Sequence, residues 1–304
     1  MSAKKAKSTK RASTQDEDDV ITMPRLVGVV HLPPLPGSPR SQDTIWDIMK
    51  AAAKDAVTLA NAGFQGVILE NFGDTPFFAT SVPKITVSAM TTAALAVSSA
   101  APDLALGINV LRNDAEAALA IAVAAGASFI RVNVLSGARV TDQGVVEGRA
   151  AELVRMRSAL GAEDVGIWAD VDVKHSAPLS ARPLASEVDD LVSRSMADAV
   201  LVTGGATGKG VNVDELATVK RAARGSPLFV ASGATPDTLP QLLVHADGVI
   251  VGSALRKDGK AGGPIDAAKA KAFAQAFARG FAMANAKGKD VKNGRVSGSR
   301  GSRG

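Results

Sequence analysis

Two carboxylates, an ammonium and an imidazole stand close together in the segment 168–175, which reads WADVDVKH. The alternation of apolar and polar residues predicts a β-strand that carries its charged side chains on one face. Burying such groups costs free energy unless they pair or meet a polar ligand. We therefore expect this strand to point its charges at a site, and the predicted acid–base residues are Asp170, Asp172, Lys174 and His175.

Lys174 suits two chemical roles, and the neighbouring carboxylates favour one of them. A lysine whose pKa is lowered by burial can capture a carbonyl as a Schiff base. Nearby carboxylates keep the ammonium charged, so we favour an acid or an anion clamp. Asp170 and Asp172 could hold a divalent cation such as Mg²⁺ together with Glu70 or Asn109. No organic cofactor is evident, and the sequence leaves the metal requirement open.

Short β-like runs alternate with amphipathic helical runs along most of the chain. Strands are predicted at residues 26–32, 66–71, 105–111, 129–135, 166–174, 199–203, 227–232 and 248–251. Helices are predicted at residues 43–62, 85–100, 114–125, 148–160, 184–196, 213–223, 236–244 and 265–282. Asp114 and Asn212 are predicted N-caps, and Thr235-Pro236 is predicted to open a helix. Gly63, Gly126 and Gly161 stand where helices should end.

Eight strand–helix pairs over about 260 residues match the size of a (β/α)₈ TIM barrel. A doubly wound open sheet is the alternative fold. It normally has fewer strands and a G-x-G-x-x-G fingerprint, which does not follow the first predicted strand. We therefore predict a (β/α)₈ barrel over residues 25–284, with disordered charged tails at 1–24 and 285–304.

Polar residues gather at the ends of the predicted strands, where barrels of this type place their active sites. The predicted substrate-binding residues are His31, Glu70, Asn71, Asn109, Arg131 and Asn133. Two of them have a structural alternative. His31 precedes three prolines and could stabilise that stiff loop instead. Arg131 could pair with Asp170 or Asp172 as a buried polar layer that fills the barrel interior.

Glycine-rich ends follow the last three predicted strands, and they favour binding of a phosphate group. Glycine lets backbone N–H groups approach an anion, and the loops after strands seven and eight are the usual phosphate site of such barrels. Tight turns are the structural alternative. The spacing is not that of a Walker P-loop. The predicted phosphate-binding residues are Gly204, Gly205, Ser232, Gly233, Gly252 and Ser253.

Composition narrows the function classes further. Cysteine is absent, which excludes disulfides, thiolate catalysis and cysteine-based metal sites. No apolar run approaches the roughly 20 residues of a membrane-spanning helix, and the N-terminus lacks a signal-peptide core. The formal net charge of +5 resides largely in residues 285–304, which hold six basic residues and one acidic residue. We expect solvated tails and no specific nucleic-acid binding.

Several motifs together resemble the BtpA/SgcQ family. They are VGVVHLPPLPGSP at 27–39, VILENFGDTPF at 67–77, GINVLRND at 107–114, FIRVNVL at 129–135, TDQGVVEG at 141–148, DVKH at 172–175 and VIVGS at 249–253. The resemblance covers residues 25–280 and implies a barrel of the ribulose-phosphate-binding class. It also implies a link to biogenesis of photosystem I, with peripheral attachment to membranes in cyanobacterial members. The family supplies no established catalytic residues.

Two readings of the function follow. The first is an isomerase or lyase that acts on a small phosphorylated or anionic metabolite, because no nicotinamide or flavin motif is visible. The second is a non-catalytic assembly factor for a membrane complex, which would use the basic C-terminal tail on an anionic surface. We expect a cytoplasmic protein, peripheral to a membrane under the second reading. Alanine-rich outer helices would permit a homo-oligomer.

Overall fold

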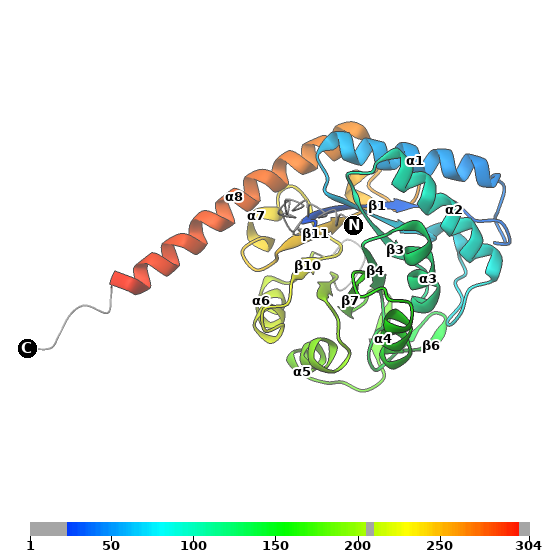
Figure 1. The fold of residues 1–304 in the computed structure, drawn as a ribbon. Coiled ribbons are helices and arrows are strands. Elements are labelled where there is room, and N and C mark those ends of the chain that lie inside the picture. Colours follow the sequence, from blue (N-terminus) through cyan, green and yellow to red (C-terminus); the bar gives the residue numbers. More distant parts are fainter. Residues whose placement is uncertain (1–22, 205–209, 298–304) are drawn as a thin grey trace, which may run out of the picture.

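The computed structural model describes residues 23–204 and 210–297. Its eight parallel strands are β1 Leu26–His31, β2 Gly66–Glu70, β3 Ala105–Asn109, β4 Phe129–Val132, β7 Gly166–Asp172, β9 Ala199–Val202, β10 Leu228–Val230 and β11 Gly248–Val251. They close into a barrel in chain order, with β11 paired to β1 (Figure 1). The predicted barrel is therefore confirmed, and the open doubly wound sheet is not formed.

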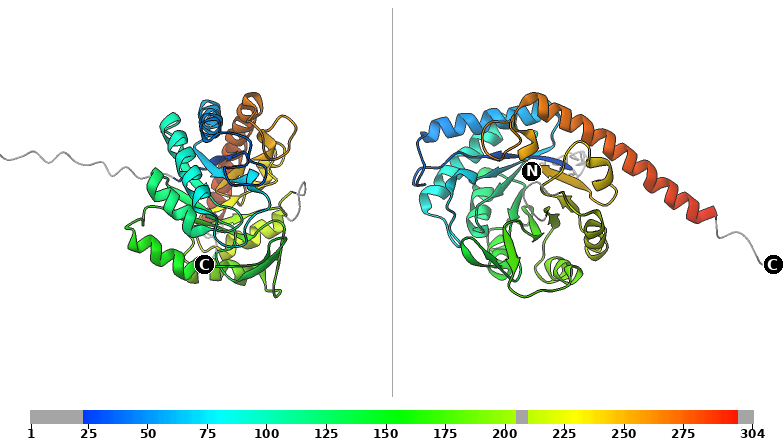
Figure 2. Two further views of the ribbon diagram at one scale, coloured as in Figure 1. Left: turned by 90° about the vertical axis from the view of Figure 1, so that its right-hand side faces the viewer. Right: turned by 180° about the vertical axis from the view of Figure 1, so that it is seen from behind.

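Helices surround the barrel on its outer side, as both views of Figure 2 show. Their bounds are α1 Ile45–Ala62, α2 Lys84–Ala100, α3 Ala115–Ala125, α4 Ala150–Ala159, α5 Leu184–Asp189, α6 Val213–Ala222, α7 Leu239–Leu242 and α8 Ala267–Ser297. The predicted N-caps are confirmed, since Asp114 accepts the Ala117 N–H and Asn212 accepts the Asp214 N–H. Gly63 and Gly126 end their helices in the left-handed conformation.

Several helix boundaries differ from the prediction. Thr235-Pro236 does not open a helix, because residues 235–238 form a turn in which the Thr238 N–H bonds the Thr235 carbonyl. Helix α7 starts only at Leu239, with Pro240 in its first turn. Helix α8 continues to Ser297, into the range predicted to be a disordered tail. Alanine and lysine favour helix, and propagation from a packed helix costs little.

A three-stranded antiparallel sheet was not predicted. It consists of β5 Ala138–Thr141, β6 Gly144–Glu147 and β8 Ser176–Pro178, in the order β6-β5-β8. The hairpin β5–β6 follows barrel strand β4, and β8 follows barrel strand β7. The hairpin leads directly into α4 in the chain. This small sheet ties together the loops of two neighbouring barrel strands.

The lower part of the barrel interior is filled by stacked aromatic rings. The Trp168 ring lies between Phe129, at 3.9 Å between centroids, and Phe229, at 4.5 Å. Gly107 and Gly248 make room for this stack, because a Cβ at either position would overlap the ring of Phe129 or Phe229. These residues belong to an apolar cluster separate from the larger core between strands and helices. Apolar side chains therefore fill the barrel interior below the polar residues.

Candidate active site

Three predicted residues form a row across the ends of the first three strands. His31, Glu70 and Asn109 lie in register on β1, β2 and β3. Asn109 donates a hydrogen bond from Nδ2 to Glu70 Oε2 at 2.6 Å. His31 Nε2 lies 3.8 Å from Glu70 Oε1. Parallel register brings the three side chains to the same end of the barrel, as the sequence predicted.

His31 is neutral and has a defined tautomer. Its Nδ1 accepts the Gly262 N–H at 3.1 Å, so the ring proton is on Nε2, the atom that faces Glu70. Burial, with Arg256 and Arg131 nearby, lowers the pKa of His31 to about 3. The side chain also packs on Phe72, with the ring centroids 4.6 Å apart. His31 is thus a fixed N–H donor at the edge of the site.

Glu70 is a buried carboxyl next to that donor. Its exposed fraction is 7 %. Burial raises the pKa of Glu70, and the charge of Arg131 and the hydrogen bond from Asn109 oppose this shift. Enzymes use buried carboxyls with a raised pKa to donate and accept protons. Glu70 therefore has the environment of a general acid–base group.

Arg131, Asn133 and Asp170 form a second cluster beside the first. Asp170 accepts two hydrogen bonds from the Arg131 guanidinium, from Nε at 3.0 Å and from a terminal nitrogen at 3.1 Å. Asn133 Nδ2 donates to the same carboxylate at 2.7 Å. The Asp170 side chain is fully buried. This is the buried polar layer given above as the alternative for Arg131, and it holds Asp170 in place.

Asp172 does not share this site. The pairing of β7 with β9 shifts between Asp170 and Asp172, so that Asp172 lies in register with Val202, which packs toward the helices. The Asp172 carboxylate instead contacts Arg139 of the small sheet. Strict alternation along the sequence predicts both carboxylates on one face of this strand. The irregularity in the strand separates them.

The predicted divalent-cation site is accordingly not assembled. Both oxygens of Asp170 are engaged by Arg131 and Asn133, and Asp172 faces Arg139. Within residues 23–204 and 210–297, no group of three or more histidine, aspartate or glutamate side chains is placed to hold a metal ion. The residues proposed as ligands do not fit a shared metal in this arrangement.

Lys174 lies at the mouth of the barrel, and its surroundings differ from the expectation. Burial, together with the charge of Arg131, lowers the pKa of Lys174. The carboxylates expected to keep the ammonium charged do not do so, because one is paired with Arg131 and the other faces outward. His175 is exposed, with a positive φ of 57°. The structure does not bring His175 into contact with the buried cluster.

Asn71 braces two loops. Its Oδ1 accepts the Leu111 N–H at 2.7 Å, and its Nδ2 donates to Asp74 Oδ2 at 3.1 Å. Asn71 is 1 % exposed. These bonds tie the loop after β2 to the loop after β3, so Asn71 supports the mouth without facing it.

The residues predicted to bind phosphate lie at the ends of β9, β10 and β11. Gly233 has a positive φ of 80°, and Ser253 starts a single 3₁₀ turn, Ser253–Leu255. Gly252 packs against the His31 ring. The Ser232 hydroxyl oxygen is buried and has no hydrogen-bond partner among the described residues. Gly204 is buried, and Gly205 lies outside the described residues.

Three arginines near the site were not predicted. Arg112 donates to the Lys174 carbonyl at 2.7 Å, Arg139 contacts Asp172, and Arg256 donates to the Val29 carbonyl at 2.9 Å. Arg112 directly follows the third predicted strand, 105–111, so its place at a strand end was a usable signal. The position of Arg139 depends on the small sheet, and that of Arg256 depends on the turn after β11. The sequence pattern predicts neither contact.

Two known proteins are similar in sequence to most of this chain. The chain is 45 % identical over 255 residues to the photosystem I biogenesis protein BtpA of Synechocystis, covering 83 % of this chain and 88 % of the relative. It is 44 % identical over 246 residues to an uncharacterized protein of Pyrococcus furiosus, with coverage of 81 % and 92 %.

Solved structures match at the level of the fold. Phosphoribosyl anthranilate isomerase from Thermus thermophilus superposes with a TM-score of 0.50 at 16 % identity, covering 84 % of this chain and 98 % of that one. KGPDC from Streptococcus mutans gives a TM-score of 0.52 at 13 % identity, with coverage of 84 % and 98 %. The sequence profile of the BtpA family matches residues 22–279. Together with the 45 % identity to a named member, this match shows that the chain belongs to the BtpA family.

Proposed function

We propose that this protein is an enzyme that binds a small phosphorylated or otherwise anionic metabolite at the carboxyl-terminal mouth of the barrel. The chemistry is of the isomerase or lyase type. One observation carries the proposal: a neutral His31 N–H and the buried Glu70 carboxyl face each other beside the paired Arg131. An assembly factor needs no such buried and converging ionisable groups.

The charges around the mouth favour an anion. Asp170 is paired with Arg131, whereas Arg112 and Lys174 form no ion pair with a carboxylate in the described part of the chain. Two cations are therefore available to a ligand, against one carboxyl, Glu70. The Ser232 hydroxyl, which has no partner among the described residues, and the Gly233 turn lie at the strand ends where barrels of this type bind phosphate.

The proposed division of roles follows from the protonation states. Glu70 takes a proton from a carbon next to a substrate carbonyl and returns it to the neighbouring atom. The His31 Nε2–H donates a hydrogen bond to the oxygen that becomes negative during this transfer. Asp170 positions Arg131 and does not react, because its oxygens are already bonded.

The names of relatives and structural neighbours point in two directions. One relative is named for photosystem I biogenesis, and one structural neighbour is an isomerase of a phosphoribosyl compound. The buried acid–base pair favours the second kind of role for this chain. No described helix combines the length and apolar character needed to cross a membrane. Peripheral membrane contact, a homo-oligomer and a cytoplasmic location stay predictions.

A thermal-shift screen with a library of sugar phosphates and other small anions tests the proposal. A ligand raises the melting temperature in relation to its occupancy. We expect phosphorylated compounds to stabilise the protein, and the Lys174→Met and Arg112→Met variants to bind them at least about tenfold more weakly. With the substrate identified, Lys174→Met should abolish turnover while the free variant keeps its stability.

The exposed Lys271 on α8 supplies the control. Lys271→Met removes the same charge away from the mouth and should leave binding unchanged. If no phosphorylated or anionic compound stabilises the protein, or if Lys174→Met and Arg112→Met both bind as well as Lys271→Met, the proposal is wrong.

A further inference from the structure

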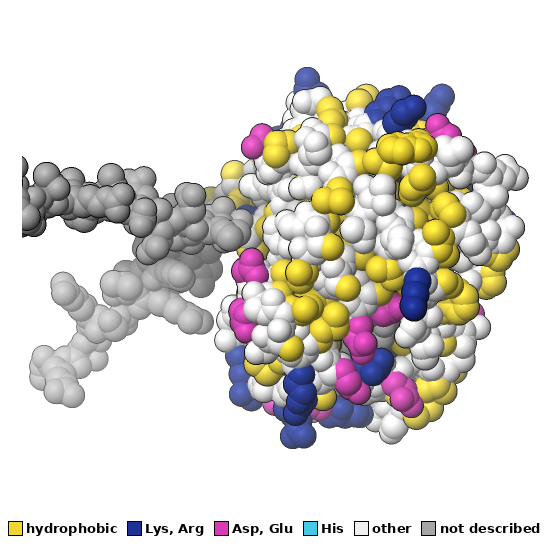
Figure 3. Space-filling model, turned by 45° about the vertical axis from the view of Figure 1, so that its right-hand side comes forward, with side chains coloured by type: hydrophobic (Ala, Val, Ile, Leu, Met, Phe, Trp, Pro, Cys, Tyr) yellow, Lys and Arg dark blue, Asp and Glu magenta, His cyan; other side chains and the backbone are white. Residues whose placement is uncertain are grey.

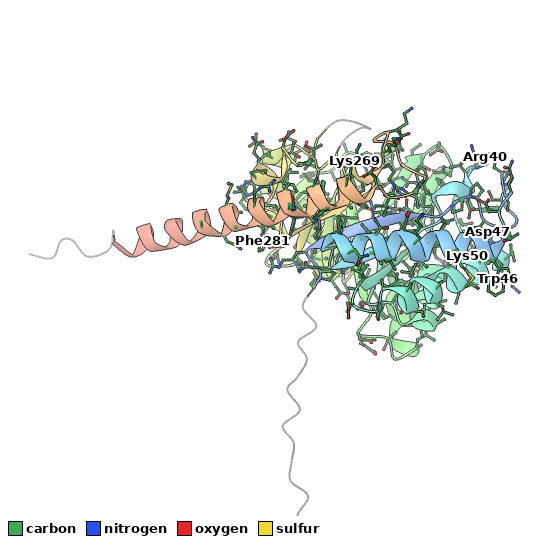
Figure 4. The ribbon with its side chains drawn as sticks, turned by 90° about the horizontal axis from the view of Figure 1, so that it is seen from above. Arg40, Trp46, Asp47, Lys50, Lys269 and Phe281 are labelled. Atoms are coloured by element: carbon green, nitrogen blue, oxygen red, sulfur yellow. The ribbon has the colours of Figure 1, made fainter. Side chains whose placement is uncertain are left out.

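A cavity of about 780 Å³ lies next to the tip of β1, beside the mouth of the barrel. Its walls come from the loop after β1, from α1, from the loop after β2 and from the loop that precedes α8. In Figure 4, α1 and α8 lie side by side, with Arg40 and Trp46 near the start of α1 and Lys269 in the first turns of α8. The volume lies in the range of pockets that hold drug-sized ligands.

The walls are mainly apolar and stiff. The apolar surface comes from Leu32, Pro33, Pro34, Ala52, Phe72 and Pro264. The backbone of Gly73 lies so close to Pro33 and Pro34 that a Cβ at this position would overlap them. Proline fixes its own backbone angle, so the loop after β1 keeps its shape without a ligand. A preformed apolar cavity suits a flat ring, which makes contact through both faces.

Asp55 adds a specific polar group to this cavity. It is 7 % exposed and lies on the wall. One carboxylate oxygen accepts the Ile265 N–H at 3.0 Å, and the other has no hydrogen-bond partner among the described residues. A buried carboxylate with a free oxygen selects a ligand that presents an N–H group. Burial raises the pKa of Asp55, in keeping with its enclosed position.

His31 connects the cavity with the reacting groups. The residue lines the cavity, and its Nε2 lies 3.8 Å from Glu70. Phe72, which packs on the His31 ring, lines the cavity as well. A molecule bound in the cavity is therefore separated from Glu70, the proposed acid–base group, only by the His31 side chain.

We propose that this cavity binds a nitrogen-containing aromatic ring of the substrate, of the nucleobase type, with ring or exocyclic N–H groups directed at Asp55. The anionic part of the same molecule then lies at the mouth near Arg112 and Lys174. This inference rests on the proposed function, because it describes the second half of the same substrate. The substrate class is a phosphorylated sugar joined to a heterocycle.

The test uses the full chain and separates the two halves of the ligand. Adenosine, guanosine, cytidine and uridine carry the ring without phosphate, ribose 5-phosphate carries the anion without the ring, and the four nucleoside monophosphates carry both. Binding is measured by isothermal titration calorimetry. We expect at least one nucleoside to bind, and its monophosphate to bind more tightly than either half.

Two substitutions probe the ring site. Asp55→Asn keeps an acceptor for the Ile265 N–H and removes the charge, so we expect about a ten- to hundredfold loss of nucleoside binding. Ala51 is exposed at the cavity edge, and Ala51→Leu should obstruct the cavity with a similar loss. Ala151→Leu, at an exposed position on α4, is the matched control and should bind like the wild type. Ribose 5-phosphate should bind all three variants equally.

The outcomes distinguish the two proposals. If ribose 5-phosphate binds and none of the nucleosides or monophosphates binds more tightly than it does, the ring site is refuted and the anion site stands. If nucleosides bind through Asp55 and phosphate adds nothing, the ring site stands and the proposed function fails. Nucleoside binding that is unchanged in both Asp55→Asn and Ala51→Leu also refutes the ring site.

Discussion

Two layers inside the same barrel differ completely in composition. The lower layer holds the stacked rings of Phe129, Trp168 and Phe229. The upper layer holds His31 and Glu70 on one side and the Arg131–Asp170 pair on the other. The two layers are only two residues apart on their strands: Phe129 precedes Arg131 on β4, and Trp168 precedes Asp170 on β7. Side chains two residues apart point to the same face of a strand, so all four point into the barrel interior.

The difference shows how one strand can serve two purposes. Apolar rings gain free energy by burial alone, so the lower layer stabilises the barrel. Buried charged groups contribute little net stability, and breaking one pair is costly because the remaining charge is unpaired. Figure 3 shows hydrophobic and charged side chains together on one outer face of the molecule. The following substitutions test the contrast between the layers.

Trp168→Ala should have the largest effect on stability. Removing a fully buried ring from the stack leaves a cavity, and we expect a loss of about 3–5 kcal/mol in the free energy of unfolding. Urea denaturation measures this loss. Trp46 is 65 % exposed, so Trp46→Ala should change stability by less than about 0.5 kcal/mol. Equal losses in the two variants would contradict a stabilising lower layer.

Asp170→Ala should cost about 3 kcal/mol, because it leaves the Arg131 guanidinium buried without its partner. Denaturation of the single variant and of the double variant Arg131→Met/Asp170→Leu distinguishes this cause from simple loss of packing. The double variant should recover most of the stability, since it removes both charges. A double variant as unstable as the single one would show that the pair itself stabilises the fold.

His31 should make stability depend on pH. Its folded pKa of about 3 lies below the ordinary value of 6.5, so between these values the unfolded chain binds a proton that the folded protein does not. The free energy of unfolding should therefore fall by about 1.4 kcal/mol per pH unit through this range as the pH is lowered. His31→Gln should flatten this part of the profile.

Nuclear magnetic resonance gives an independent measurement of the same group. The His31 ring signal, identified by its loss in His31→Gln, should show the neutral Nε2–H tautomer at pH values well above 3. Titration of this signal near pH 6.5 would contradict a neutral, buried donor.

Glu70→Gln should have the smallest effect on stability and the opposite sign. Burial raises the pKa of Glu70, so above the ordinary value of 4.5 the folded protein holds a proton that the unfolded chain has released. Stability of the wild type therefore falls as the pH rises through this window, and the glutamine variant does not share the fall. Urea denaturation at several pH values should show that Glu70→Gln becomes more stable relative to the wild type as the pH rises above 4.5. A stability difference that does not change with pH would refute the raised pKa of Glu70.

Several features of the site could be predicted from the sequence because they depend on local pattern. The alternation of strands and helices gave the barrel, and parallel register then placed His31, Glu70 and Asn109 in one row. The pairing of Arg131 with a carboxylate of β7 was foreseen as an alternative and is present. The individual roles of these residues stay predictions.

Other features could not be predicted because they depend on contacts between distant segments. The separation of Asp170 from Asp172 follows from an irregularity in the pairing of β7 with β9. Arg139 reaches Asp172 only because the small sheet brings them together. Burial and the charge of Arg131 lower the pKa of Lys174, and the two carboxylates do not oppose this shift because each contacts an arginine.

The sequence alone determined the order of the strands and helices and the end of each strand at which polar groups gather, because periodicity and chain direction are local properties. Tertiary structure decided which of those groups face one another, which are paired and which are protonated. Pairing, burial and pKa depend on the distances between residues far apart in the chain, such as His31 and Gly262.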